Sequence, residues 1–350
     1  MKKNVIKAFV LFIAVMSTIS IIGMVFMEDN SAEEAVEIVS EQTLIPGGQS
    51  VGIKMDVKGV LVVGLEEIET EDSIVNPGYD AGLQLGDTIL SIDNKDVYYA
   101  YEVASIVKNS DGILDIKVLR GGETMSFTIK AAKEYESGEY KLGIWVKEKI
   151  AGIGTLSFYN PENNTFAALG HGIYERKTNV LVEAGGGELL KTEVSSINEG
   201  EAGKPGEIRG IFCNQDQPLG KVIKNSEHGI YATGINVDET YLAEPMVVGS
   251  KEHINVGKAY ILTTVKGTNV ERFEIEITKI NKNSSSTGKD IEIKVCDKKL
   301  LEHSGGIVQG MSGSPIIQDG KLVGAVTHVL VNDPTRGYGI FIENMLEAAK

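Results

Sequence analysis

Two short motifs carry the residue types that could do chemistry in this chain, and they lie about 140 positions apart. The first is ALGHGI (168–173), which places His171 between two glycines, and the second is GMSGSPI (310–316), which contains Ser312. An imidazole that takes the proton of a serine hydroxyl makes that hydroxyl a nucleophile, and this is the chemistry of acyl transfer. The motifs therefore predict a hydrolase site in which His171 is the general base and Ser312 the nucleophile.

The glycines around Ser312 let the backbone turn sharply, so the amides of Gly310 and Ser312 can point at one spot and form an oxyanion hole. Ser314 is a competing nucleophile, but it occupies the place of a small spacer before a proline, and we assign the role to Ser312. The run GKLVGAVT (320–327) then predicts a turn and a strand that lines the substrate cleft. His328 follows the nucleophile, so we expect it to shape the cleft rather than act as the base.

A histidine followed by a serine near the C-terminus is the order of chymotrypsin-type peptidases, in which an aspartate between them orients the histidine. The aspartates in that interval are Asp216, Asp238, Asp290 and Asp297. We expect Asp297, which follows an apolar run at 291–295, to be the third member, with Asp290 as the main alternative. The segment DKKLLE (297–302) also fits a helix with Asp297 as its N-cap.

Composition excludes several classes of function. The 350 residues carry a formal net charge of −15, so a nucleic-acid partner is not expected, because phosphate binding needs a basic surface. The two cysteines and five histidines show no metal-binding spacing, and we expect neither a metal nor a cofactor. Whether Cys213 and Cys296 form a disulfide is left open by the sequence, with two free thiols favoured.

The N-terminus predicts export. Three lysines among the first seven residues precede an uncharged run of 20 residues, 8–27, which is long enough to cross a bilayer. This run exceeds the usual apolar region of a cleaved signal, and an acidic stretch follows it. We expect a signal anchor at 1–27, a linker at 28–42, and a body outside the cytoplasmic membrane. A cleaved signal is the alternative.

Residues 43–133 are expected to form a PDZ domain. The run NPGYDAGLQLGDTILSID (76–93) resembles the most specific signature of that family, and 99–109 fits the helix that lines its groove. PDZ domains bind an extended peptide as an added strand. We expect the peptide-binding loop at Ser50, Val51, Gly52 and Ile53. Docking of this domain on its own peptidase domain, with no ligand in trans, is the alternative.

Residues 134–350 contain about ten short apolar runs bounded by glycine, asparagine, aspartate or proline. So many strands with few helices predict a mainly β fold, namely a chymotrypsin-like double β-barrel ending in a short helix from 342.

The whole arrangement resembles the stage IV sporulation protein B family of membrane-anchored serine peptidases from endospore-forming bacteria. The matching segments are PGGQSVG (46–52), FAALGHGI (166–173), GGIVQGMSGSPII (305–317) and GAVTHV (324–329). The resemblance implies an anchor, a PDZ domain and a serine endopeptidase with Asp297 at the family's functional aspartate.

The resemblance also implies secretion from the forespore into the space between two membranes. There the peptidase cleaves itself and a membrane-bound regulator of an intramembrane protease, and a sigma factor is then processed. The competing functions are a catalytically inactive PDZ scaffold and a general PDZ chaperone-protease. The intact pair of His171 and Ser312 argues against the first, and the PDZ domain preceding the peptidase domain argues against the second.

Overall fold

The computed structural model describes residues 42–237, 243–283 and 288–350. The predicted anchor at 1–27 and all but the last residue of the predicted linker lie outside these ranges. Within the described residues, no helix is both long enough and apolar enough to span a membrane. Strands dominate this part of the chain, and its longest helix, α3 (Ala100–Lys108), has nine residues.

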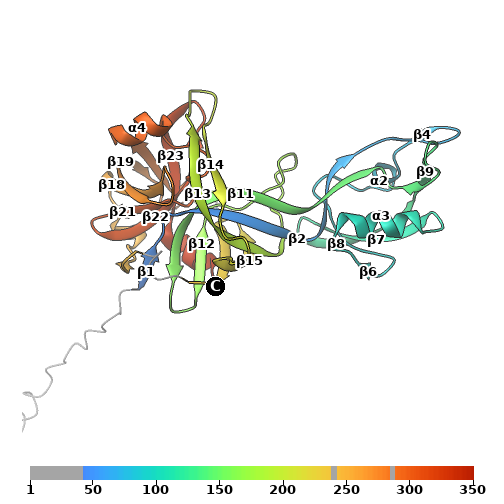
Figure 1. Ribbon diagram of the computed structural model, residues 1–350, viewed down its shortest axis with the longest axis horizontal. Helices are drawn as coiled ribbons and strands as arrows, with labels where there is room; N and C mark the ends of the chain where they lie inside the picture. The colour runs from blue at the N-terminus through green and yellow to red at the C-terminus, as the bar shows by residue number, and fades with distance from the viewer. Residues whose placement is uncertain (1–41, 238–242, 284–287) are drawn as a thin grey trace, which may run out of the picture. The chain divides into compact units, whose positions relative to one another are not determined.

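Six strands close into a first ring, because each hydrogen-bonds two neighbours and the last returns to the first (Figure 1). In order around the ring they are β2 (Ser50–Leu65), β11 (Ile144–Asn160), β12 (Thr165–Ala168), β16 (Gly229–Gly234), β15 (Gly220–Ser226) and β13 (Ala184–Asn198). Three further strands extend the ring: β1 (Thr43–Pro46) on β11, β17 (Met246–Val247) on β1, and β14 (Glu207–Phe212) on β13.

A second set of strands forms a closed six-stranded barrel. Its order is β18 (Gly257–Thr264), β19 (Val270–Ile280), β20 (Ile291–Val295), β23 (Asp333–Phe341), β22 (Lys321–Leu330) and β21 (Pro315–Gln318). The sequence of β19 shows why such a barrel forms: Phe273, Ile275 and Ile277 are buried, while the charged residues between them are more exposed. Helices α4 (Lys298–Ser304) and α5 (Ile342–Ala348) complete this part.

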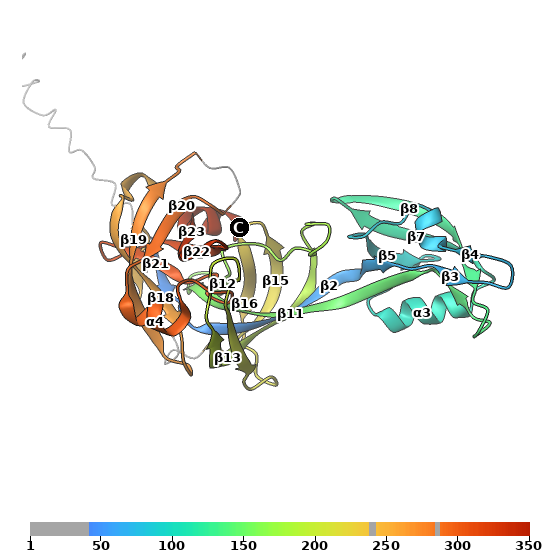
Figure 2. The same ribbon diagram turned by 90° about the horizontal axis from the view of Figure 1, so that it is seen from above.

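A small domain is built on the second half of β2, with β5 (Thr88–Ile92), β7 (Ile113–Arg120) and β8 (Glu123–Lys130) following in the sheet (Figure 2). Helix α3 packs on it through buried valines. The short elements of the described chain are β3 (Ile68–Glu69), β4 (Ile74–Val75), α2 (Pro77–Asp80), β6 (Lys95–Asp96), β9 (Ala132–Lys133), β10 (Tyr140–Lys141) and η2 (Lys251–His253).

The aspartate in the small domain's signature, Asp87, has a structural role. Asp87 is fully buried and accepts hydrogen bonds at 2.6 Å from both Nε and Nη2 of Arg120. Its carboxylate also accepts from the amide of Gln84 at 2.8 Å, which fixes the turn before β5. A buried carboxylate is tolerated here because it is paired and hydrogen-bonded.

The predicted boundary at residue 43 is wrong. The first half of β2 pairs with β11 on one side and β13 on the other, so it belongs to the first ring, as does β1. Only from Val60 does β2 pair with β5 of the small domain. The small domain is therefore inserted between β2 and β11, whose long strands contribute to both parts. The sequence of this 16-residue strand does not say which sheet each half joins.

Candidate active site

The turn after β12 positions His171. Leu169 and Gly170 both have left-handed backbone conformations, with φ of +72° and +70°, so the chain reverses directly after the strand. His171 Nδ1 lies 2.8 Å from the carbonyl oxygen of Gly172. A carbonyl only accepts, so Nδ1 carries the proton and Nε2 keeps its lone pair. This is the tautomer that a general base needs.

The loop between α4 and β21 carries Ser312 between two glycines with positive φ. Gly310 and Gly313 both have φ of +100°, a conformation that residues with side chains rarely adopt. A Cβ at Gly313 would also lie 2.0 Å from the carbonyl oxygen of Thr155, which shows how closely β11 approaches this loop. Glycine is therefore required at both positions.

The structure leaves the amides of Gly310 and Ser312 without acceptors, since the hydrogen bonds of the described residues include none from either. The carbonyls on the other side of the same two peptide bonds are held. Gln309 O accepts from Ile208 N at 2.8 Å, and Met311 O accepts from Ser314 N at 3.0 Å. Because a trans peptide points its N–H and C=O in opposite directions, both amides are fixed and available to bind an anion.

In this structure Ser312 is in a resting arrangement. Its Oγ donates to the carbonyl oxygen of Thr327 at 2.6 Å rather than to His171. Thr327 is itself held by a hydrogen bond of 2.5 Å from its hydroxyl to Gly288 O. Transfer of the Ser312 proton to His171 therefore requires a side-chain rotation that breaks the bond to Thr327.

His171 lies beside His328, with ring centroids 4.8 Å apart. Burial lowers the pKa of His171, although its hydrogen bond to Gly172 opposes this shift. Burial, followed by the charges of His171 and Lys289, lowers the pKa of His328 to about 4. Both imidazoles are thus neutral near pH 7, which is the state in which His171 can accept a proton. The proximity of two histidines 157 positions apart gave no signal in the sequence.

The structure does not bring the expected third member, Asp297, to His171. Its carboxylate caps α4, accepting from Leu300 N at 3.2 Å, and it also accepts from Glu274 N at 3.3 Å. Among the described residues, no hydrogen bond joins His171 to any carboxylate. The helix-capping interpretation of this segment is the one that the geometry supports.

The other aspartates do not replace Asp297. Asp290 is buried, and its Oδ2 accepts from Phe341 N at 3.0 Å and from Asn344 Nδ2 at 2.9 Å at the start of α5. Asp216 is exposed in a turn, and Asp238 lies outside the described residues. Ser314, the competing nucleophile, is fully buried.

The expected peptide-binding loop at 50–53 is also wrong. Ser50, Val51, Gly52 and Ile53 lie inside β2, where they face β11 on one side, and all but Ser50 face β13 on the other. A strand bonded on both edges cannot accept a third strand. The resemblance to PDZ domains predicted a loop here, but Gly52 is instead required by packing, since a Cβ there would lie 2.7 Å from the ring of Phe212.

A groove lies elsewhere in the small domain, between α3 and the first residues of β11. Val103 and Val107 of α3 form one wall, and the segment 142–146 (LGIWV) forms the other. Residues Ile144–Lys147 pair with β2 along one edge only, which leaves the other edge toward the groove.

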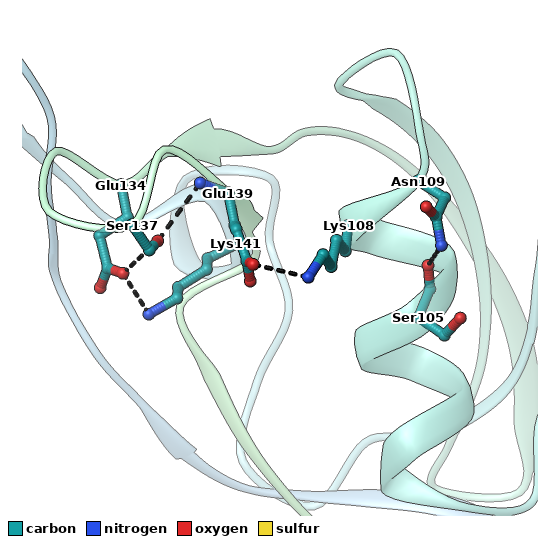
Figure 3. Close-up of polar contacts among 7 residues, drawn as sticks. All are labelled: Ser105, Lys108, Asn109, Glu134, Ser137, Glu139 and Lys141. Atoms are coloured by element: carbon teal, nitrogen blue, oxygen red, sulfur yellow. Dashed lines mark hydrogen bonds and ion pairs between the residues drawn. The ribbon is translucent and has the colours of Figure 1, made fainter.

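Charged pairs line the end of this groove (Figure 3). Lys108 of α3 contacts Glu139 at 2.7 Å, and Lys141 of β10 contacts Glu134 at 2.5 Å. Both lysines are therefore neutralised, and Glu66 and Glu67 add further negative charge to the lining. The groove as a whole is acidic.

The described residues contain no group of three or more histidine, cysteine, aspartate or glutamate side chains placed to hold a metal ion. Cys213 and Cys296 are both free thiols.

Comparisons with known proteins place this chain in a family. Two crystal structures of the Rv3671c protease, one described as an inactive form and the other, from M. tuberculosis, as the active form, are similar to this chain. They show 14% and 15% identity, both with a TM-score of 0.32. The alignments cover 56% and 57% of this chain and 81% and 72% of the respective structures. The profile of the family described as SpoIVB peptidase S55 matches residues 138–346. This match spans more than half of the chain, which is therefore a serine peptidase and belongs to the SpoIVB peptidase S55 family.

Proposed function

We propose that this peptidase is an endopeptidase in which Ser312 is the nucleophile, His171 the general base, and the amides of Gly310 and Ser312 the oxyanion hole. The observation that carries this proposal is the pair of fixed, unbonded amides beside Ser312, because such donors are aimed at charge that develops only during the reaction. Asp297 has no part in it, since its carboxylate is used at α4.

The chemistry follows from the resting arrangement. The Ser312 hydroxyl leaves Thr327 O and donates to Nε2 of His171, which takes the proton as Oγ bonds to the substrate carbonyl carbon. The carbonyl electron pair moves onto oxygen, which binds to the amides of Gly310 and Ser312. Collapse of this intermediate breaks the C–N bond, and Nε2 returns the proton to the leaving amine. Water then repeats the sequence and releases the acyl group.

The test is Ser312→Ala against Ser314→Ala, two serines in the same loop. The first removes the nucleophile, so self-cleavage and labelling by a fluorophosphonate should fall to background. The second removes a buried hydroxyl that has no hydrogen-bond partner, and it should keep both activities. Labelling that survives in Ser312→Ala would refute the assignment.

We further propose that the groove between α3 and β11 binds an extended peptide, in the manner of a PDZ domain, and regulates the peptidase. The acidic lining supports a neutral or basic segment over one that presents a free carboxylate. Ala104 is an exposed groove residue, and Ser105 is its exposed neighbour outside the groove. Ala104→Trp should weaken cleavage of the protein partner, while Ser105→Trp should not. Equal cleavage by the two variants would exclude the groove.

Family membership and the apolar N-terminus support a role in sporulation. We propose that the chain is anchored in a membrane, with its body in the space between forespore and mother-cell membranes. There it cleaves itself and a membrane-associated regulator that restrains an intramembrane protease, so that a sigma factor is processed. A reporter that works only after export, fused after Lys350, should be active. Activity of a cytoplasm-only reporter at the same position would refute this topology.

A further inference from the structure

We propose that Thr155 is a positioning residue that holds the histidine and serine segments of the active site together and fixes the oxyanion loop. This inference rests on the proposed roles of His171 and Ser312. Thr155 lies on β11, is only 1% exposed, and was not among the residues that the sequence singled out.

Three hydrogen bonds place Thr155 between the two segments. Its amide donates to Ser312 O at 2.9 Å, and its hydroxyl donates to Gly310 O at 2.7 Å. Its carbonyl accepts from Leu169 N at 3.2 Å, directly before the turn that carries His171. One residue thus contacts the backbone on both sides of the nucleophile and the backbone next to the base.

The hydroxyl bond is the one that a side chain controls. Gly310 has a positive φ, but glycine adopts positive and negative φ about equally readily. The backbone preference of Gly310 therefore does not hold the loop in this conformation. The Thr155 hydroxyl fixes the carbonyl of Gly310, whose amide is one of the two proposed oxyanion donors. Without that hydroxyl, the carbonyl of Gly310 loses its donor. The Gly310–Met311 peptide lies between the two peptides that carry the proposed oxyanion donors, and among the described residues it would then be held only by the bond from Met311 N to Val308 O at 3.1 Å.

Another buried threonine hydroxyl in this protein makes no hydrogen bond within the described part of the chain and so offers a control. Thr263, on β18, is fully buried, and its hydroxyl has no hydrogen-bond partner. Thr263→Val is therefore a matched control for Thr155→Val, because both replace a buried hydroxyl with a methyl group of nearly the same size. Only the second removes a hydrogen bond to the active-site loop.

The experiment measures hydrolysis of p-nitrophenyl acetate and the rate of fluorophosphonate labelling in the full chain. Thr155→Val should lower kcat and the labelling rate by about 10- to 100-fold, less than or equal to the loss of a direct oxyanion donor. KM should stay within about threefold, because the loss appears in the transition state. Thr155→Ser should recover most of the rate, and Thr263→Val should match the wild type.

Wild-type labelling by a folded Thr155→Val protein would overturn the inference. If that variant does not fold, the labelling rates of Thr155→Ser and Thr155→Ala are compared instead. Both variants lack the methyl group, and they differ only in the hydroxyl. Equal rates for these two would also overturn it. Failure of the proposed function looks different: Ser312→Ala would then be labelled like the wild type, whatever Thr155 does.

Discussion

The substitution Asp297→Asn distinguishes between two roles for the Asp297 carboxylate, namely orienting His171 in a triad and capping α4. In a catalytic triad, asparagine at the orienting position lowers kcat by about 10⁴-fold, which corresponds to about 5.4 kcal/mol of transition-state free energy. In the structure, Asp297 instead accepts from Leu300 N and Glu274 N, and it does not contact His171. Asparagine is as good an N-cap as aspartate, so the bond to Leu300 survives.

The cost can be estimated from these two bonds. Asparagine has one side-chain oxygen, so the 3.3 Å bond to Glu274 N is lost, which lowers the free energy of unfolding by about 0.5–1.5 kcal/mol. Alanine removes the cap as well and should cost about 1–3 kcal/mol. Activity at a temperature where all proteins are folded should stay within about threefold of wild type in both variants.

The assay combines urea denaturation with fluorophosphonate labelling. Denaturation midpoints should decrease in the order wild type, Asp297→Asn, Asp297→Ala, while labelling rates remain close together. A folded Asp297→Asn protein that labels ~10⁴-fold more slowly would refute this reasoning. The carboxylate would then have to reach His171 in a catalytic conformation other than the one described.

Three further predictions concern the same regions. Because burial lowers the pKa of His171 below 6.5, the acid limb of kcat/KM against pH should have its midpoint below 6.5, and a midpoint near 7 would indicate a nearby carboxylate. The unfolded chain then binds that proton more tightly, so stability measured by denaturation should fall as pH decreases through 6.5. Overpacking a core ordinarily costs about 1–3 kcal/mol, and Gly52→Trp should destabilise the first ring by more than this. The reason is that the Cβ alone would lie 2.7 Å from Phe212. An unchanged melting temperature would contradict this prediction.

The sequence by itself determined the class of fold and indicated the candidate reacting groups. His171 and Ser312 could be singled out because their glycine-rich surroundings are local: the turns that carry them depend on residues a few positions away. Short apolar runs bounded by turn residues, such as the one that forms much of β19, predicted a mainly β chain for the same reason. The helix at 99–109, expected from the resemblance to PDZ domains, is α3 (Ala100–Lys108).

Tertiary structure alone decided how distant segments meet. The sequence favoured Asp297 as a triad member and also fitted it as a helix cap, and only its contacts with Leu300 and Glu274 show that it is the cap. The two halves of β2 form one continuous strand, yet one joins the first ring and the other the small domain. Thr155 gave no signal, because a threonine in a strand is ordinary until the oxyanion loop packs against it. Pairing between strands far apart in sequence depends on the packed whole, which no local pattern encodes.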